Sequence, residues 1–171
     1  ESKWTQDAGY LRMLNTGPAM PLSVYQVKKR YEALEKEADT QKNMFYYAIR
    51  LPGDDRLVGF IQLYWIEWNN GSGNVRLGIG TAEDRNQGYG TEALQLILRF
   101  VFQELNLFRL SAVVPEYNPA ALHLFEKAGF VKEVCRREAL NRFGRRWDLF
   151  HLGLLCGEQA EQPERKEEAH G

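Results

Sequence analysis

The sequence predicts an α+β domain whose sheet is mostly antiparallel and is flanked by helices. Runs rich in β-branched and aromatic residues follow one another around turn signals such as Asn70-Gly71, as in hairpins. Segments with apolar residues at helical spacing lie between these runs, and this mixture is typical of the α+β class. With 171 residues, 44% of them hydrophobic, the chain is long enough for one domain with a full core.

The first half of the chain contains two predicted helices followed by three predicted strands. A helical pattern is under way at residues 4–14, and a second one over residues 26–38 places Val27, Tyr31 and Leu34 on one face. Strands are expected over residues 45–51, 57–68 and 75–80, with a turn at 52–55 and a hairpin loop at 69–73.

The second half contains two more helices and three more strands. The helix that follows Gly90 carries one apolar stripe, so we expect it to pack on a sheet face; the stripe consists of Leu94, Ile97, Leu98, Val101 and Leu105. Asn118 as N-cap, Pro119 at the first helical position and Gly129 after the last turn define another helix. Strands are expected over 107–114, 130–140 and 145–155, the last two forming a hairpin around 141–144.

The segment Arg85-Asn86-Gln87-Gly88-Tyr89-Gly90-Thr91 lies between a predicted strand and a predicted helix. Its two glycines allow a tight turn, and the unpaired N–H groups and positive dipole end of the following helix favour an anion. The segment therefore predicts a phosphate-binding loop.

The spacing Gly88-x-Gly90-x-x-Ala93 also satisfies the loose dinucleotide fingerprint, which makes a nicotinamide-binding oxidoreductase an alternative. In a dinucleotide fold the first glycine ends a strand that opens a βαβ unit. Here the polar loop 81–87 intervenes and the upstream segments are predicted hairpins, which argues against a nicotinamide or flavin site. The Walker pattern fails because no Gly-Lys-Ser/Thr follows.

The glycine loop, the amphipathic helix and the next strand are followed by Asn118-Pro119-Ala120-Ala121 and by Glu126-Lys127-Ala128-Gly129-Phe130. This order of motifs resembles the GNAT superfamily of acetyl-CoA-dependent N-acetyltransferases. It is most similar to the branch that contains ribosomal-protein N-terminal acetyltransferases and spermidine acetyltransferases. GNAT domains usually open with a strand before the first helix, so the resemblance implies that this strand is missing here and that one sheet edge is left unpaired.

The resemblance implies acetyl-CoA as co-substrate, with pantetheine between two strands that splay apart, at residues 77–80 and 110–114. Backbone amides of residues 87–91 would hold the pyrophosphate, and main-chain groups near Ile79 would polarise the thioester carbonyl. Asn118 would contact pantetheine, while Arg85 and Lys127 could reach phosphates. Simpler structural roles explain these three residues equally well: Asn118 as a helix cap, Arg85 as a solvated loop charge and Lys127 as a surface lysine. The implied coenzyme-binding residues are Leu77, Gly78, Ile79, Arg85, Asn86, Gln87, Gly88, Tyr89, Gly90, Thr91, Asn118, Phe125 and Lys127.

Transfer to an amine requires the neutral amine, whereas a lysine-like ammonium has a pKa near 10.4, so only about one part in a thousand is neutral at about pH 7.4. A carboxylate is the natural base. Glu67 is the first candidate, because it ends a long predicted strand among apolar neighbours that would raise its pKa. Glu116 and Asp148, also at strand ends, are alternatives. An exposed carboxylate on a strand edge explains Glu67 equally well.

Where many family members carry a tyrosine acid, this chain has Phe125, and a phenyl ring cannot donate a proton. Tyr117 is a nearby alternative. A thiolate with a pKa near 8.5 needs little assistance to leave, so we expect an active N-acetyltransferase that works by direct attack in a ternary complex. A non-catalytic acyl-CoA-binding domain is the alternative.

The expected acceptor is a primary amine, either a protein N-terminus or a small amino compound. It would bind at residues 64–68 and at the hairpin 141–147, whose Arg142, Arg145 and Arg146 do not favour a polyamine cation. A homodimer is left open.

Composition excludes several other classes. No apolar run reaches the length of a membrane span and no signal peptide opens the chain, so a cytoplasmic protein is expected. Residues 157–171 contribute −3 to the formal net charge of −1, which leaves +2 for residues 1–156 and implies neither nucleic acid nor a membrane as partner. We expect a domain at 1–156 and a charged, mobile tail at 157–171. Cys135 and Cys156 are expected as reduced thiols in small apolar positions, and the scattered histidines predict no metal site.

Overall fold

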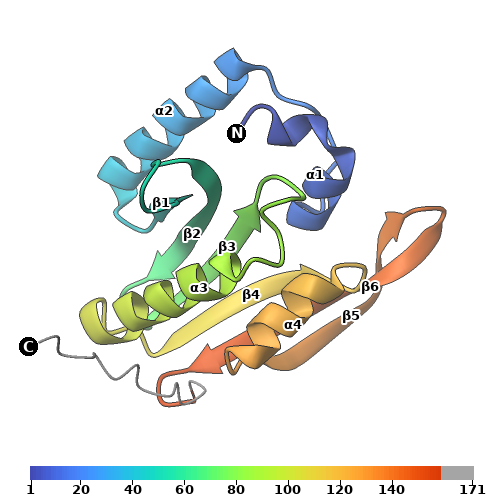
Figure 1. Ribbon diagram of the computed structural model, residues 1–171. Coiled ribbons are helices and arrows are strands. Elements are labelled where there is room, and N and C mark those ends of the chain that lie inside the picture. The colour runs from blue at the N-terminus through green and yellow to red at the C-terminus, as the bar shows by residue number, and fades with distance from the viewer. Residues whose placement is uncertain (159–171) are drawn as a thin grey trace, which may run out of the picture.

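The computed structural model describes residues 1–158, with the side chains of residues 38 and 41 left aside (Figure 1). Most of the predicted tail at 157–171 lies outside the described residues. The elements are η1 (Trp4–Gln6), α1 (Ala8–Leu14), α2 (Val24–Gln41), β1 (Phe45–Arg50), β2 (Leu57–Glu67), β3 (Ser72–Ile79), α3 (Tyr89–Arg99), η2 (Phe100–Glu104), β4 (Arg109–Pro115), α4 (Pro119–Lys127), β5 (Val131–Arg142) and β6 (Arg145–Leu155). Within this part of the chain, no helix has the length and hydropathy needed to cross a membrane.

The strands form one sheet in the order β1-β2-β3-β4-β6-β5. Every neighbouring pair is antiparallel except β3 and β4, which are parallel. The predicted α+β class with a mostly antiparallel sheet is therefore confirmed. The helical elements η1, α1 and α2 precede β1, and among the described strands β1 pairs only with β2 and forms an edge of the sheet.

The two faces of the sheet carry different helices. A Cβ at Gly90 of α3 would contact Leu77 and Ile79 of β3, whereas a Cβ at Gly78 would meet Tyr10 and Leu14 of α1. Because successive residues of a strand point to opposite faces, α3 covers one face and α1 the other. Figure 1 shows α3 and α4 together in front of the sheet.

The main core lies between the sheet and α3. The predicted apolar stripe is confirmed: Leu94, Ile97, Leu98 and Val101 are buried, and Leu105 is partly buried against them. They pack with fully buried strand residues, namely Leu63, Val75, Leu110, Leu152 and Leu154. Burial of this size supplies most of the free energy that holds the sheet and the helix together.

The structure differs from the sequence prediction in several places besides small shifts of element bounds. The first predicted helix is interrupted at Asp7, because its carboxylate accepts hydrogen bonds from the backbone N–H groups of Gly9 and Tyr10 and begins α1 there. The last hairpin is tighter than predicted, since the strands run to Arg142 and from Arg145. Cys135 and Cys156 are exposed, so the prediction that they fill small apolar positions was wrong.

Candidate functional site

The parallel strands β3 and β4 pair only along their first three residues. The paired positions are Ser72 with Arg109, Gly73 with Leu110, and Asn74 with Ser111. Beyond Asn74, β3 stays paired with β2 as far as Ile79, while β4 stays paired with β6 as far as Pro115. The edges of β3 and β4 that face each other are therefore open over their second halves. The splay includes residues 77–79 as predicted, but on β4 it begins only after Ser111, because residues 110 and 111 are paired with β3.

Helix α3 begins beside the open end of β3. Gly88 is its N-cap, with φ of +88°, and no side chain caps the helix. A Cβ at Gly88 would meet no atom within 4 Å, so the loop leaves open space in front of the first helical N–H groups. Uncapped amides at the positive end of a helix, beside a left-handed glycine, suit a phosphate or pyrophosphate group.

Gly90 does not have the backbone conformation that we expected. It lies within α3, its φ is not positive, and a Cβ there would make ordinary contacts with Leu77, Ile79 and Leu124 at 3.5–3.8 Å. A methyl group would therefore fit at Gly90 and the packing of α3 does not require glycine there, whereas the tight turn depends on Gly88 and on Asn86, whose φ is +60°.

The loop before α3 is anchored by two arginines. Arg56 donates two hydrogen bonds of 2.8 Å to the carboxylate of Asp84, which also accepts from Thr81 Oγ1, and these contacts lower the pKa of Asp84. Arg85 turns inward and donates from Nη2 to the carbonyl of Gly80 at 2.8 Å and from Nε to the carbonyl of Ile79 at 3.3 Å. Its guanidinium thus holds the end of β3, and a phosphate contact of Arg85 stays a prediction.

Helix α4 carries three of the residues that the resemblance implied. Asn118 caps it by accepting from the N–H of Ala121, and its amide donates to the carbonyl of Met13 at the end of α1. Phe125 is buried in the main core against Phe130, with ring centroids 5.0 Å apart. Lys127 is exposed in the last turn of α4.

The structure does not bring Glu67 to the splay. Glu67 ends β2 and pairs with Ser72, the first residue of β3. The splay is near the other end of β3, at Ile79, which is seven residues or roughly 23 Å along the strand from Ser72. Its carboxylate accepts from Asn70 Nδ2 at 3.0 Å and from Ser72 Oγ at 3.1 Å, so it stabilises the hairpin loop. The sequence showed that Glu67 lies at the end of a strand, but it could not show at which edge of the splayed sheet that strand end would lie.

The two alternative carboxylates lie at the correct end of the sheet, but Glu116 is turned toward β6, and Asp148 of β6 is turned toward β5. Glu116, just after β4, accepts a hydrogen bond from the backbone N–H of Asp148 on β6. Asp148 accepts from the N–H of Glu138 and from Cys135 Sγ, and the Glu138 hydrogen bond is the main reason that its pKa is lowered. Since β6 lies on the side of β4 away from β3, none of the three candidate bases points into the splay.

Tyr117, considered as a substitute proton donor, is buried next to the end of α1. Its hydroxyl donates to the carbonyl of Arg12 at 3.1 Å, and its ring packs against Phe143 and Trp147. Burial raises its pKa. The hydroxyl thus joins β4 to α1 rather than facing the open strand edges.

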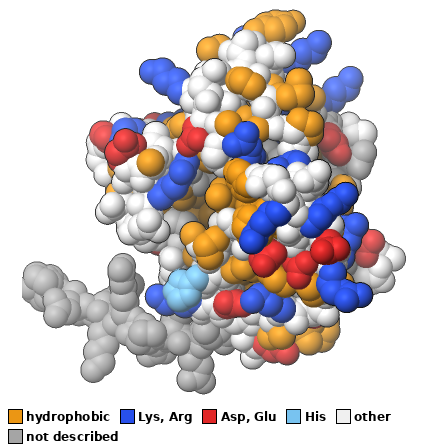
Figure 2. Space-filling view, turned by 90° about the vertical axis from the view of Figure 1, so that its right-hand side faces the viewer, with side chains coloured by type: hydrophobic (Ala, Val, Ile, Leu, Met, Phe, Trp, Pro, Cys, Tyr) orange, Lys and Arg blue, Asp and Glu red, His pale blue; other side chains and the backbone are white. Residues whose placement is uncertain are grey.

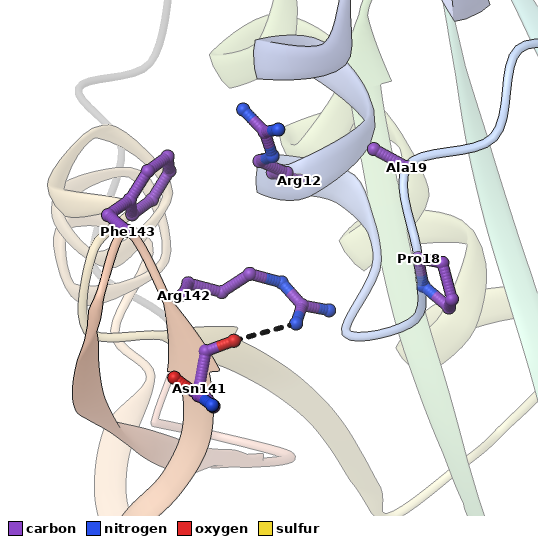
Figure 3. Close-up of a pocket in the computed structure, with 6 residues that line it drawn as sticks. All are labelled: Arg12, Pro18, Ala19, Asn141, Arg142 and Phe143. Carbon is purple, nitrogen blue, oxygen red and sulfur yellow. Dashed lines mark hydrogen bonds between the residues drawn. The ribbon is translucent and has the colours of Figure 1, made fainter.

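A cavity of about 370 Å³ lies between α1, the connection to α2 and the tip of the β5–β6 hairpin (Figure 3). It is lined by Arg12, Pro18, Ala19, Asn141, Arg142 and Phe143. In Figure 3, Arg142 reaches from the hairpin toward the connecting segment; it donates to the carbonyls of Thr16 and Gly17. Arg12 lies over the ring of Phe143 at 5.5 Å. We refer to this cavity as the hairpin pocket.

The hairpin pocket is cationic. Its lining includes two arginines and, among the described residues, no acid. Arg145 lies over Trp147 near the same hairpin tip, 3.4 Å from the ring centroid. Figure 2, which views the molecule from the right-hand side of Figure 1, shows Lys and Arg side chains bordering exposed hydrophobic ones.

A family model for the acetyltransferase (GNAT) domain matches residues 2–131, which contain both splayed strands, the Gly88 loop and α4. The chain belongs to the GNAT acetyltransferase family. The match covers more than half of the chain and agrees with the resemblance seen in the motifs.

Among curated relatives of this GNAT domain, the SPbeta prophage-derived uncharacterized N-acetyltransferase YokL of Bacillus subtilis is 28% identical over 118 residues, covering 69% of this chain and 66% of YokL. The probable N-acetyltransferase YjcK of the same organism is 31% identical over 115 residues, or 63% of this chain and 56% of YjcK. The chain thus spans about 56–66% of the length of these two relatives. The spermidine N(1)-acetyltransferase of Vibrio cholerae is 29% identical over 99 residues, or 58% of this chain and 57% of that enzyme.

The solved spermidine N-acetyltransferase from Vibrio cholerae in complex with CoA and spermine superposes with a TM-score of 0.77 at 20% identity, over 92% of this chain and 88% of that one. At this identity the likeness is one of fold. It confirms the GNAT fold for the mixed sheet and its helices.

Several residues of the site could not be found from the sequence. Arg56 and Asp84 are 28 residues apart and meet only because the start of β2 lies beside the loop. Arg12 and Phe143 come from opposite ends of the chain. Such pairs have no spacing signature that a single sequence could reveal.

Proposed function

We propose that this GNAT domain is an acetyl-CoA-dependent N-acetyltransferase that transfers the acetyl group to a primary amine by direct attack in a ternary complex. The observation that carries the proposal is the separation of β3 from β4 after Asn74 and Ser111, directly beside the uncapped start of α3. An open strand edge can bind the amide groups of pantetheine as a neighbouring strand would, and the helix start suits the pyrophosphate.

The coenzyme contacts follow from this arrangement. Backbone amides of residues 87–91 bind the pyrophosphate, and the open edge of β3 at Leu77, Gly78 and Ile79 binds pantetheine. Asn118 and Phe125 form the side of the pantetheine site opposite β3, and Lys127 is available to bind a phosphate. When bound, acetyl-CoA supplies a thioester whose carbonyl the β3 main chain polarises. The neutral acceptor nitrogen forms the new bond to the acetyl carbon, the carbon–sulfur bond breaks, the thiolate leaves, and the nitrogen gives up one proton to water.

The hairpin pocket is the proposed acceptor site. It lies beside α1, which covers the face of β3 opposite α3. An arginine-lined pocket repels a polycation and attracts a carboxylate or peptide carbonyl. We therefore propose that the acceptor carries such a group near its amine, as a protein N-terminus or a small amino compound does.

The positions of the three candidate bases also favour an acceptor with an α-amino group. None of the three candidate carboxylates points into the splay, so in this proposal the amine loses its proton to water. An α-amino group has a pKa of about 7.7–8.0, so about a fifth to a third is neutral at about pH 7.4, compared with about one part in a thousand for a lysine-like amine. An α-amino acceptor therefore needs the least help from the protein.

The test is an acetylation screen with acetyl-CoA over amino acids, polyamines, aminoglycosides and N-terminal peptides, read as free thiol released. We expect activity on α-amino compounds and little on polyamines. An Arg12→Gln variant should raise KM for these acceptors with kcat nearly unchanged, because Arg12 is proposed to bind and not to react. Thermal stabilisation by NAD but not by CoA would overturn the proposal.

The alternative is an acyl-CoA-binding domain without transfer activity, and Phe125 is the residue that favours it. Its signature would be stabilisation by CoA with no acceptor acetylated by the wild type, together with a clear gain of activity in Phe125→Tyr.

A cytoplasmic location and a homodimer stay predictions. Cell fractionation and light scattering of the purified protein would test them.

A further inference from the structure

A second cavity, of about 350 Å³, lies on the α2 side of the sheet and shares no lining residue with the hairpin pocket. We refer to it as the α2 pocket. It is lined by Leu34, Glu37, Asn43, Met44, Gln62, Tyr64, Trp65 and Arg76. Its volume is at the lower end of the range for small-molecule sites.

Arg76 is held in a fixed orientation in the α2 pocket. Its Nε donates to Gln62 Oε1 at 2.8 Å, and its guanidinium lies over the ring of Tyr64, 5.6 Å from the centroid. Gln62 is itself only 2% exposed, and its amide contacts Met44 Sδ. A buried amide that holds one edge of a guanidinium leaves the opposite edge pointing in a defined direction.

The terminal nitrogens of Arg76 have no acceptor among the described residues. Its hydrogen bond is the one to Gln62, and no carboxylate of the described chain lies within 4.0 Å of it. The side chain is half-buried and lies near a second cation, Arg30. An unpaired guanidinium at a partly desolvated position is unfavourable, and a bound carboxylate would pair with both of its terminal groups.

Trp65 adds a second, independent observation. It lies in a β-bulge of β2 with φ of +49°, a conformation that is strained for a bulky residue within a strand. Its indole is 71% exposed at the rim of the pocket and packs edge-on against Tyr64. Strain that exposes a large aromatic ring beside an unpaired cation indicates a binding role.

We propose that the α2 pocket binds a small aromatic carboxylate. The terminal groups of Arg76 bind the carboxylate, and Tyr64 and Trp65 bind the flat apolar body. The α2 pocket and the proposed acceptor site in the hairpin pocket share no lining residue, so this ligand is distinct from the acetyl acceptor. Tyr64 and Trp65, which the sequence predicted as part of the acceptor site, thus contact a different ligand. The proposal does not depend on acetyl transfer.

The experiment measures binding of phenylacetate, phenylacetamide and acetate to the full chain by calorimetry, without acetyl-CoA. Phenylacetate should bind at least about tenfold more tightly than phenylacetamide, which lacks the charge, and than acetate, which lacks the ring. In NMR spectra of the protein, the backbone amide chemical-shift changes caused by phenylacetate should map to residues 62–65 and 74–77.

Variants make the test specific. Arg76→Gln should abolish phenylacetate binding, and Arg76→Lys should weaken it at least about tenfold, because an ammonium cannot form the bidentate pair. Trp65→Ala, at an exposed side chain, should weaken binding without unfolding the protein. Arg12→Gln in the hairpin pocket is the matched control and should leave phenylacetate binding unchanged. The proposal is overturned if phenylacetate does not bind the wild type at up to about 10 mM. Equal binding of phenylacetamide, or undiminished binding in Trp65→Ala, also overturns it.

Discussion

The indole of Trp4 occupies the space that a side chain at Gly80 would need, since a Cβ built on Gly80 would overlap the ring. Trp4 packs edge-on with Tyr10, which in turn contacts the position of Gly78. The segment before α2 is thereby joined to the end of β3, next to the Gly88 loop.

Gly80→Ala should destabilise the protein by about 1–3 kcal/mol, because Trp4 must move to admit even a methyl group. Thermal and urea unfolding measure the change. Gly17→Ala is the control, since a Cβ there meets no atom within 4 Å and should leave stability nearly unchanged. Equal stability of the two variants would show that Trp4 is not tightly packed on β3.

Gly88→Val should abolish CoA binding while the protein remains folded. A branched side chain would fill the open space before α3 and resist the positive φ, at about 1–2 kcal/mol of stability. Gly53→Val is closely matched, because Gly53 also has positive φ, at +110°, and open space around it. Calorimetry with CoA should therefore separate two variants of similar stability. Undiminished affinity in Gly88→Val would remove the loop from the site.

Asp84→Asn should lower Tm at neutral pH but not in acid. Because hydrogen bonds from Arg56 and Thr81 lower the folded pKa of Asp84 below its ordinary value of 3.8, the pair stabilises the fold above that pH. This stability is lost as the pH falls through the folded pKa, so the Tm values of wild type and variant should converge there. Asp55→Asn, whose pair with Arg50 is exposed, should show little difference at any pH. A constant Tm difference across the acid range would contradict the prediction.

Glu67→Gln should change kcat by no more than about twofold, or about 0.4 kcal/mol in the barrier. The reason is that Glu67 of β2 pairs with the first residue of β3, whereas the splay lies at the opposite end of β3. The amide oxygen of Gln can still accept from Asn70 and Ser72, so the fold should be retained. Steady-state rates on one accepted amine provide the measurement. A loss of about a hundredfold would restore Glu67 as the base.

Phe125→Tyr should change the rate by no more than about tenfold, about 1.4 kcal/mol in the barrier, since the thiolate is a good leaving group near neutral pH. The added hydroxyl enters a core position that is 4% exposed, so we also expect a lower Tm. A pH–rate profile beside the wild type measures the first effect. A much larger gain would show that the wild type lacks a needed acid.

Much of the fold could be predicted because its signals are local. The apolar stripe of α3 follows from residues three or four apart, and Asn118, Pro119 and Gly129 mark the ends of α4 within a few positions. The Gly88 loop and helix start are likewise contiguous, so the sequence by itself determined these elements and their order, and it predicted a phosphate-binding loop at that position.

The tertiary structure decided which ends of these elements meet. Pairing of β3 with β4 stops after Asn74 and Ser111, 37 positions apart in the chain, which places Glu67 far from the splay. Arg142 reaches the carbonyl of Gly17 across 125 residues, and this contact helps form the hairpin pocket. Strand register and helix packing set such contacts through the burial of many side chains at once, and no single spacing in the sequence encodes them.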